Sequence, residues 1–407
     1  MIHKNIIIGS GFSSLGAILG LKKRGEKCLI ITGKVLFSKT DQNLIDLPSR
    51  NFEKYKNNIY QSIKNNNLEI NTKNNFISYI GFGGLSNLWG KIFNINIEGN
   101  NKIRNFLIKQ LKIKTNQEIN LNHGLKLFRL TEQKITIKEI YKSLDKSRFK
   151  TISSTVKKIK FNTKKKIFLI YLFNDQILKA KNIYLASGIF STLKLLNSLD
   201  KKIFRNKIQL NHSDMCYGIC FALEKNFKKK IGNEFFYFNQ NKNNFAGRLS
   251  VLNENIINKY DMSVFFLLLY KLTKFFKIKI LVLSVLYKRP ANSSLIFFKN
   301  SGININVKKT FKNSVIINQL KKSLKKTFNI KFFIFKRTLV GSDFHYSCNI
   351  IKNINLKNKN IFFKNLFILD SSYSTKHAFF PTFQMIYESY VRTKNKLSIN
   401  KFLNKNV

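Results

Sequence analysis

The chain has 407 residues, of which 44% are hydrophobic and 14% aromatic, and this composition excludes an intrinsically disordered protein. The length predicts two domains, or one domain with a large insertion. A net charge of +53 would suit a polyanionic partner, but the lysines are spread over the whole chain without a recognisable nucleic-acid module, which disfavours nucleic acid.

The N-terminal residues predict a cofactor site. An apolar strand, Ile6 to Ile8, runs directly into a G-x-G-x-x-S turn that contains Gly9, Gly11 and Ser14, and a helix-compatible run follows from Leu15 to Arg24. In this order, the first glycine permits a tight turn, the second lets backbone amides approach a pyrophosphate, and the small third residue allows the helix to pack on the strand. The helix N-terminus adds a dipole that favours an anion.

The second strand is predicted at Cys28 to Ile31, which puts Thr32 where such a fold usually has an acidic residue for the ribose hydroxyls. A hydroxyl group can still hydrogen-bond a ribose, although more weakly than a carboxylate. Further along, Val156 to Phe161 and Ile167 to Leu172 predict a hairpin. A short strand ending at Gly188 then leads into a helix from Ser191 to Leu196.

The Phe265 to Phe276 stretch predicts a basic amphipathic helix, followed by a buried strand from Ile278 to Leu286. Its lysines argue against a membrane span. Two interpretations remain open: an ordinary helix of a substrate domain, which is favoured, and a peripheral membrane contact.

The cysteine content and the N-terminal residues indicate the cellular compartment. Four cysteines, Cys28, Cys216, Cys220 and Cys348, are too few and too unevenly spaced for a disulfide framework, and the spacing of Cys216 and Cys220 does not suggest a metal site. The first residues lead straight into a strand without a signal peptide. We therefore expect a cytoplasmic protein, with peripheral membrane association as an option.

Four blocks, in order, resemble the glucose-methanol-choline (GMC) family of flavin oxidoreductases. They are the Gly9/Gly11 turn; the glycine-rich loop Gly81 to Gly90; the segment Ile183 to Leu196; and the C-terminal pair Asp343 to Ser347 and Asn365 to Ser372, continuing to Thr382. The resemblance implies an α/β fold: a Rossmann-like FAD-binding domain with an inserted α+β substrate domain that contains an antiparallel sheet.

The resemblance also implies domain boundaries. We expect the FAD-binding domain in residues 1–100 and 151–215, a covering segment in 101–150, the substrate domain in 216–336, and a C-terminal segment, 337–407, that completes the FAD-binding domain and the active site.

The active-site base implied by the resemblance is His345, since histidine has a pKa suited to taking the hydroxyl proton of an alcohol. The family's second catalytic position, a His or Asn, is matched by Phe380, which cannot hydrogen-bond a substrate oxygen. Either nearby His377 takes this role, or one base suffices, or activity is lost; we favour a working enzyme with an altered site.

The resemblance implies FAD as the cofactor. The matching positions are Gly9, Gly11, Ser14, Thr32, Gly83, Gly84, Ser86, Asn87, Val156, Gly188, Asp370, Pro381 and Thr382. Leu88 stands where some family members attach the flavin through a histidine, so we expect non-covalent FAD. For Asp370, a helix N-cap is the competing interpretation.

The expected function is oxidation of a CH–OH group in a sugar or another small alcohol, by hydride transfer to flavin N5 with His345 as base. The electron acceptor is not identified by the sequence. Two alternatives remain open: a flavoprotein of another reaction class, and a non-catalytic polybasic protein that binds a membrane or nucleic acid.

Overall fold

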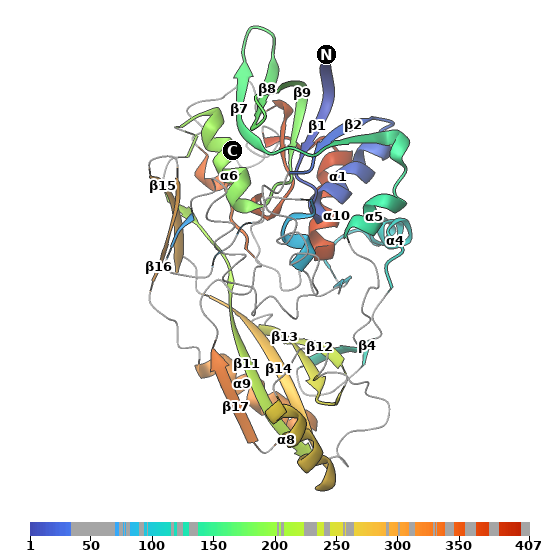
Figure 1. The fold of residues 1–407 in the computed structure, drawn as a ribbon, viewed down its shortest axis with the longest axis vertical. Coiled ribbons are helices and arrows are strands. Elements are labelled where there is room, and N and C mark those ends of the chain that lie inside the picture. The colour runs from blue at the N-terminus through green and yellow to red at the C-terminus, as the bar shows by residue number, and fades with distance from the viewer. Residues whose placement is uncertain are drawn as a thin grey trace.

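The computed structural model has two halves arranged along its long axis (Figure 1). We call them the nucleotide half, which contains β1 (Ile2–Ile8), and the substrate half, which contains β14 (Ile278–Lys288). The structure describes residues 1–33, 70–72, 76, 78, 82–88, 93–95, 97–114, 118–119, 125–129, 137–201, 203–204, 207–223, 234–239, 245–254, 257, 264–289, 293–299, 302–308, 314–328, 330, 332–337, 346–354, 364–373 and 382–399.

The nucleotide half is built on a mixed sheet. Seven described strands form it: β6 (Phe149–Ile152), β2 (Cys28–Ile31), β1, β9 (Ile177–Leu185), β8 (Ile167–Leu172) and β7 (Val156–Asn162) in this order, with β18 (Leu366–Ile368) also on β9. β6, β2, β1, β9 and β18 run parallel, whereas β8 and β7 form an antiparallel hairpin. β9 pairs with β8 in its first part and with β18 in its last, so the C-terminal chain completes the parallel layer.

Helices cover both faces of this sheet, as the alternation of buried residues along β1 requires. Ile7 points into a core shared with α1 (Phe12–Lys23), α4 (Asn101–Gln110), α5 (Ile137–Ser143) and α10 (Thr382–Lys394). Ile6 and Ile8 point into the opposite core, which contains α6 (Ile189–Leu199). Since both faces are buried, the strands read as continuous apolar runs.

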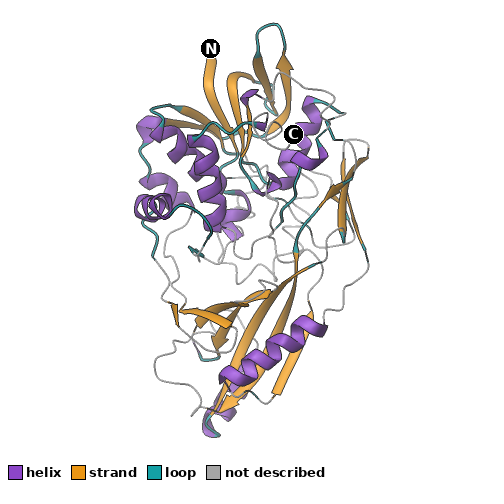
Figure 2. Ribbon diagram, turned by 180° about the vertical axis from the view of Figure 1, so that it is seen from behind, coloured by secondary structure: helices purple, strands orange, loops and turns teal. Residues whose placement is uncertain are grey.

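The substrate half has an antiparallel sheet. Its described strands are, in order, β17 (Phe332–Arg337), β11 (Ser213–Leu223), β14, β13 (Phe245–Val251), β12 (Glu234–Asn239), β5 (Leu125–Arg129) and β4 (Glu118–Ile119). Leu281 and Leu283 of β14 pack towards α9 (Ser314–Phe328), which crosses one face (Figure 2). Ile280 and Val282 face α8 (Val264–Phe275) on the other face.

A four-stranded sheet packs against the nucleotide half. It consists of β10 (Ile208–Gln209), β15 (Ser294–Lys299), β16 (Gly302–Val307) and β3 (Ile70–Asn71). Ile296 and Ile303 belong to the same core as α6. Short 3-10 helices complete the described elements: η2 (Gly84–Leu88), η3 (Lys146–Arg148), η5 (Ile351–Asn353) and η7 (Ser371–Tyr373).

The predicted α/β class, with an antiparallel sheet in a second half, is what the structure has. Two of the expected domain segments, however, contribute to the two halves differently from the expectation. Residues 101–150 supply α4 and α5 to the nucleotide half, but their β4 and β5 extend the substrate sheet. Residues 294–307, expected in the substrate domain, pack against the nucleotide half instead.

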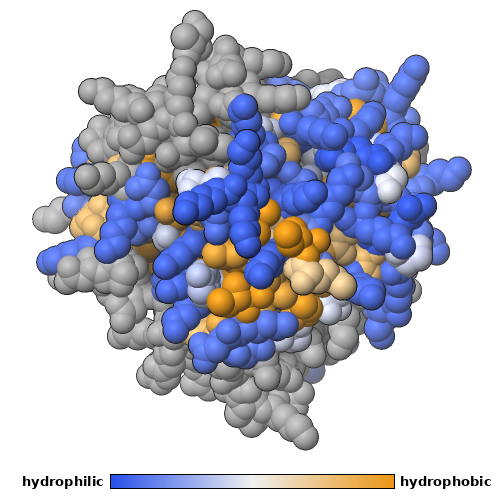
Figure 3. Space-filling model, turned by 90° about the horizontal axis from the view of Figure 1, so that it is seen from above, coloured by the Kyte–Doolittle hydropathy of each residue, from blue (hydrophilic) through white to orange (hydrophobic). Residues whose placement is uncertain are grey.

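Seen from the nucleotide end, the described surface is mostly hydrophilic, with an apolar patch near the centre of the view (Figure 3). Exposed apolar residues lie where β1 and β9 begin, namely Met1, Ile2 and Ile177. Among the described helices, none has the length and apolar character needed to cross a bilayer. All four cysteines are buried, and none of them forms a disulfide.

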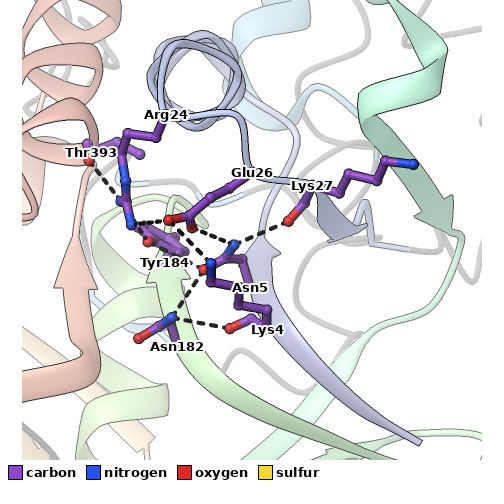
Figure 4. A network of polar contacts seen from close by, with 8 residues as sticks. All are labelled: Lys4, Asn5, Arg24, Glu26, Lys27, Asn182, Tyr184 and Thr393. Carbon is purple, nitrogen blue, oxygen red and sulfur yellow. Dashed lines mark hydrogen bonds and ion pairs between the residues drawn. The ribbon is translucent and has the colours of Figure 1, made fainter.

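A polar network closes the sheet at the end of α1 that is farther from the glycine turn (Figure 4). The Asn5 carboxamide donates to Glu26 Oε2 at 2.9 Å, and Arg24 donates to Glu26 Oε1 at 2.6 Å and to the Thr393 carbonyl at 3.0 Å. Although burial opposes it, hydrogen bonds from Asn5 and Arg24 lower the pKa of the Glu26 carboxyl. The network thereby joins β1, the end of α1 and the end of α10.

α1 and α10 run parallel and in direct contact because α1 has glycines on the contacting side. A Cβ atom on Gly16 would lie 2.2 Å from the Ile386 carbonyl oxygen, and one on Gly20 would lie 2.8 Å from Thr393 Cβ. In addition, Ser389 Oγ donates to the Ser13 carbonyl at 2.5 Å. The two helices can therefore pack only with hydrogen at these positions.

We expect Gly16→Ala to lower the free energy of unfolding by about 3 kcal/mol or more, because the added methyl group meets backbone rather than a movable side chain. Urea denaturation followed by far-UV circular dichroism measures this change. Lys23→Ala, at an exposed position of the same helix, is the control and should change stability little. A Gly16→Ala protein as stable as the wild type would contradict this packing.

Candidate functional site

The predicted glycine turn lies at the carboxyl end of β1. Gly9 follows β1 with a φ of +109°, and its amide donates to the Ile31 carbonyl of β2. A Cβ atom on Gly9 would lie 2.2 Å from the Ala186 carbonyl oxygen, directly after β9. Gly9 is thus required both by its backbone conformation and by the close passage of the chain that leaves β9.

The second glycine-rich segment docks onto the first through two serine hydroxyls. Ser10 Oγ accepts from the Gly83 amide at 2.8 Å and donates to the Thr32 carbonyl at 3.0 Å. Ser86 Oγ accepts from the Phe12 amide at 3.1 Å, at the N-terminus of α1. The two predicted loops, more than 70 residues apart in sequence, therefore form one structure.

Gly11 makes this docking sterically possible. A Cβ atom there would lie 3.1 Å from Ser86 Oγ, closer than most Cβ contacts. In the docked segment, Gly83 and Gly84 have φ values of +83° and +54°, which favour glycine. Ser14, the third position of the turn, is fully buried and donates from Oγ to the Gly9 carbonyl at 2.9 Å. Its small side chain closes the turn against the helix.

Thr32 directly follows β2, whereas Val156 belongs to β7 at the other end of the strand order. The Thr32 amide donates to the Ile152 carbonyl at 3.0 Å, and Thr32 Oγ1 is 3.3 Å from the same oxygen. Val156 begins β7 just beyond this point and packs on the nucleotide core. The position directly after β2 thus has a hydroxyl group and no carboxylate.

Asp370 is buried directly after β18 and links the C-terminal chain to α6. Its Oδ2 accepts from the Gly188 amide at 3.0 Å and from Thr192 Oγ1, while its Oδ1 accepts from the amide and hydroxyl of Ser372. Burial raises the pKa of the Asp370 carboxyl, against the effect of these hydrogen bonds. The capping interpretation of Asp370 is therefore visible in the structure, and Thr192 is a partner that the sequence did not reveal.

Two further helix N-termini lie near the glycine turn. Gly188 precedes α6 with a φ of +82°, and a Cβ atom there would meet nothing within 4 Å. Thr382 begins α10, which runs parallel to α1. Since helix N-termini carry partial positive charge, this edge of the sheet suits an anionic group.

Several predicted site residues lie outside the described residues. They are His345, His377, Phe380 and Pro381, together with the side chains of Asn87 and Leu88. The chain next to His345 is described, however. Tyr346 is buried, and its ring centroid lies 5.5 Å from that of Phe190 in the first turn of α6 and 5.5 Å from that of Phe76.

The residues after Tyr346 are fixed by the backbone of two segments. Ser347 exchanges two hydrogen bonds with Asn211, just before β11, and the Cys348 amide donates to the Ser371 carbonyl. The Ser347 hydroxyl is buried and has no hydrogen-bond partner in the described part of the chain. The segment that follows His345 thus lies between the carboxyl ends of the parallel strands and the connection to the substrate half.

That connection contains a buried polar cluster that sequence reasoning missed. Arg289, directly after β14, donates from Nη1 to both carboxylate oxygens of Asp214 at 3.0 and 2.9 Å, and from Nη2 to the Lys308 carbonyl. His212 lies beside it, with Nδ1 3.1 Å from the Ser213 carbonyl and Nε2 2.8 Å from Ser294 Oγ. No sequence motif marks these residues, because they meet only when β11 and β14 pair.

Comparison of the sequence with family models and with curated proteins gave no match. A crystal structure of pyridoxine 4-oxidase from Mesorbium loti is similar, with a TM-score of 0.56 and 7% sequence identity, over 97% of this chain and 99% of that chain. This similarity shows the fold. A crystal structure of the tetracycline destructase Tet(51) aligns over 100% of this chain and 88% of that chain at 9% identity, but its TM-score of 0.35 is too low to show a shared fold.

We expect Ser86→Ala to loosen the contact between the two glycine loops, because the Phe12 amide loses its hydroxyl acceptor. Leaving such a donor unsatisfied costs about 1–3 kcal/mol. Hydrogen exchange measured by mass spectrometry should accelerate in peptides that cover Phe12 and the 82–88 loop. Ser143→Ala, which removes a hydroxyl bond within α5, is the control. Unchanged exchange at Phe12 in the Ser86→Ala protein would contradict the docking.

His212 should make stability depend on pH. Burial lowers its pKa to about 4, below the ordinary value of 6.5, so the unfolded chain binds an additional proton between these values. This contribution to stability is present above pH 6.5 and is lost as the pH falls towards 4. Urea denaturation at several pH values should show this loss in the wild type and a smaller one in His212→Asn.

Ser294→Ala is the matched variant, because it removes the partner of His212 Nε2 but keeps the titrating ring. We expect it to be less stable than the wild type and yet to retain the pH dependence. Equal slopes for the wild type and His212→Asn would show that His212 is not the titrating group.

Proposed function

We propose that the protein is an FAD-dependent oxidoreductase that oxidises the CH–OH group of a small alcohol, with sugars and sugar-derived alcohols as the first class to examine. The observation that carries this proposal is the docking of two glycine-rich loops by Ser10 and Ser86 at the carboxyl end of β1, where α1 begins. In open α/β sheets, ligands bind outside the carboxyl ends of the strands.

The described residues fit a dinucleotide. The donors at the turn are backbone amides and hydroxyls, and no acidic residue lies in the first turn of α1 or α6, so a pyrophosphate would meet no negative charge from these helices. The open space beside Gly188 leaves room for the phosphates or the ribityl chain. The buried Ser347 hydroxyl, two residues after His345, is available as a further donor.

We assign the cofactor contacts by segment. Gly9, Gly11 and Ser14 would hold the pyrophosphate; Thr32 and Val156 would lie at the adenosine; Gly83, Gly84, Ser86 and Asn87 would follow the flavin; and Gly188, Asp370, Pro381 and Thr382 would line the remaining side. For Asp370 the role is to fix the Gly188 amide, since its carboxylate already accepts from protein groups. When bound, FAD supplies a hydride acceptor at N5.

His345 is the proposed base. Its neutral imidazole would accept the hydroxyl proton of the alcohol as the carbon–hydrogen bond breaks. Its neighbour Tyr346 packs against Phe190 at the start of α6, and Ser347 is bonded to Asn211, so the chain directly after His345 is fixed by contacts with these two segments. His377 is the proposed second polar group, in place of Phe380 at the matching position.

The structural similarity to pyridoxine 4-oxidase supports this proposal in its general form, since the name of that protein denotes an oxidase of a small molecule.

The cofactor can be tested on the purified protein by its visible absorbance spectrum before and after acid precipitation. We expect an oxidised-flavin spectrum that passes into the supernatant, because Leu88 cannot form the covalent link that histidine forms. Colour that stays in the pellet would contradict non-covalent binding. A colourless protein that also fails to bind added FAD would contradict the proposed function.

The base can be tested with the flavin-loaded protein. His345→Ala should bind FAD as the wild type does, but reduce the flavin about 10²- to 10⁴-fold more slowly when an alcohol substrate is added without oxygen. Stopped-flow loss of flavin absorbance measures the rate. His377→Gln is the comparison variant and should have a smaller effect. If His345→Ala keeps the full rate, the protein is a flavoprotein of another reaction class.

A further inference from the structure

The helix α8 has two apolar faces, and one of them faces outwards. Its inner residues Phe266, Leu267, Leu269 and Tyr270 pack on Leu252, Ile257 and Ile280 at the substrate sheet. Its outer apolar residues are 57% to 81% exposed: Val264, Phe265, Leu268, Leu272 and Phe275, with Phe276 directly after the helix. These positions recur every three or four residues and therefore form one stripe along the helix.

The outer stripe accounts for half of the large exposed apolar residues among those described. The same side of the sheet adds Ile334 of β17, 52% exposed, and Tyr217 of β11, 43% exposed. Ile334 pairs with Ile219, which belongs to the core under α8, so it lies on the side of the sheet that α8 covers. An exposed apolar stripe of this kind marks an interaction site.

Basic residues accompany the stripe. Lys271 and Lys274 lie on α8, and Lys277 follows it, whereas residues 264–288 contain no Asp or Glu. Aromatic and aliphatic side chains together with flanking lysines are the combination by which amphipathic helices lie in the interface of an anionic bilayer. Each lysine near such a surface adds electrostatic attraction.

The position of α8 suits this role. It lies at the end of the long axis that is farthest from the nucleotide half, so a planar surface can reach it without meeting the rest of the molecule (Figure 1). A second copy of the chain fits less well, since pairing two such helices would bring their lysines together without acidic partners. A nucleic acid would leave the leucines and valine without a matching apolar surface.

We propose that the α8 stripe docks the protein on the surface of an anionic lipid bilayer, with the apolar side chains inserted among the acyl chains and the lysines at the headgroups. This inference does not depend on the flavin or on His345.

Flotation with lipid vesicles tests the proposal. We expect the full-length protein to bind vesicles of phosphatidylcholine and phosphatidylglycerol and to bind phosphatidylcholine alone weakly. Leu272→Gln combined with Phe275→Gln should reduce the partition coefficient at least about tenfold, because both side chains lose their apolar contact. The matched control combines Phe173→Gln with Ile177→Gln, which are exposed apolar residues outside α8.

The lysines are tested in the same assay. Lys271→Gln with Lys274→Gln should weaken binding by about an order of magnitude, whereas Lys325→Gln with Lys326→Gln on α9, the same change in net charge, should weaken it less. The Leu268→Trp protein should show a blue shift of its tryptophan fluorescence emission when anionic vesicles are added. Circular dichroism and thermal melting establish that each variant is folded.

Three results would overturn the proposal. The first is no binding to either kind of vesicle. The second is binding that Leu272→Gln/Phe275→Gln leaves unchanged, which would assign it to the overall charge of +53. The third is self-association in sedimentation equilibrium that this double variant abolishes in the absence of lipid, which would make a second copy the occupant of the stripe.

Discussion

The contact between α1 and α10 is the constraint on which the nucleotide half depends. Gly16 and Gly20 of α1 face Ile386 and Thr393 of α10 at distances that exclude any side chain on the glycines. This contact holds the C-terminal helix next to α1 and its glycine turn. In addition, β18 pairs with β9 in the same sheet. Residues from both ends of the sequence therefore meet at one edge, and a site built from the Gly9 turn and the segments before α10 requires this packing.

Polar interactions distinguish the two ends of the nucleotide sheet. At one end, Arg24, Glu26 and Asn5 are joined in a partly buried network that ties α1 to β1 and α10. At the carboxyl end, the corresponding interactions are made by loops: Ser10 and Ser86 join the glycine segments, and Asp370 holds the start of α6. The closed end fixes the framework, whereas the loop-built end can present backbone amides to a ligand.

Much of the local structure was predictable because it is encoded by neighbouring residues. The strand Cys28–Ile31, the hairpin of β7 and β8, and the amphipathic α8 lie where periodicity and turn residues indicate. The fold class was implied by the resemblance of four sequence blocks, in order, to a known family. The partners of Ser10, Thr192 and Arg289 could not be predicted, since each is defined by contacts between distant segments. For the same reason, nothing local shows that β4 and β5 join the substrate sheet.

The structure shows where the few carboxylates of this lysine-rich chain are placed. Carboxylates are scarce in this chain, and several are used inside it: Asp214 pairs with Arg289, Glu26 with Arg24, and Glu388 with Arg392, whose guanidinium also lies 3.6 Å from the Tyr373 ring centroid. Because these carboxylates pair with arginines, few acidic groups are left to balance the surface lysines. With a net charge of +53, the long-range electric field of the protein is positive. Such a field attracts any anionic surface without selecting an orientation. The exposed apolar stripe of α8 would supply an orientation, because its side chains gain free energy by leaving water.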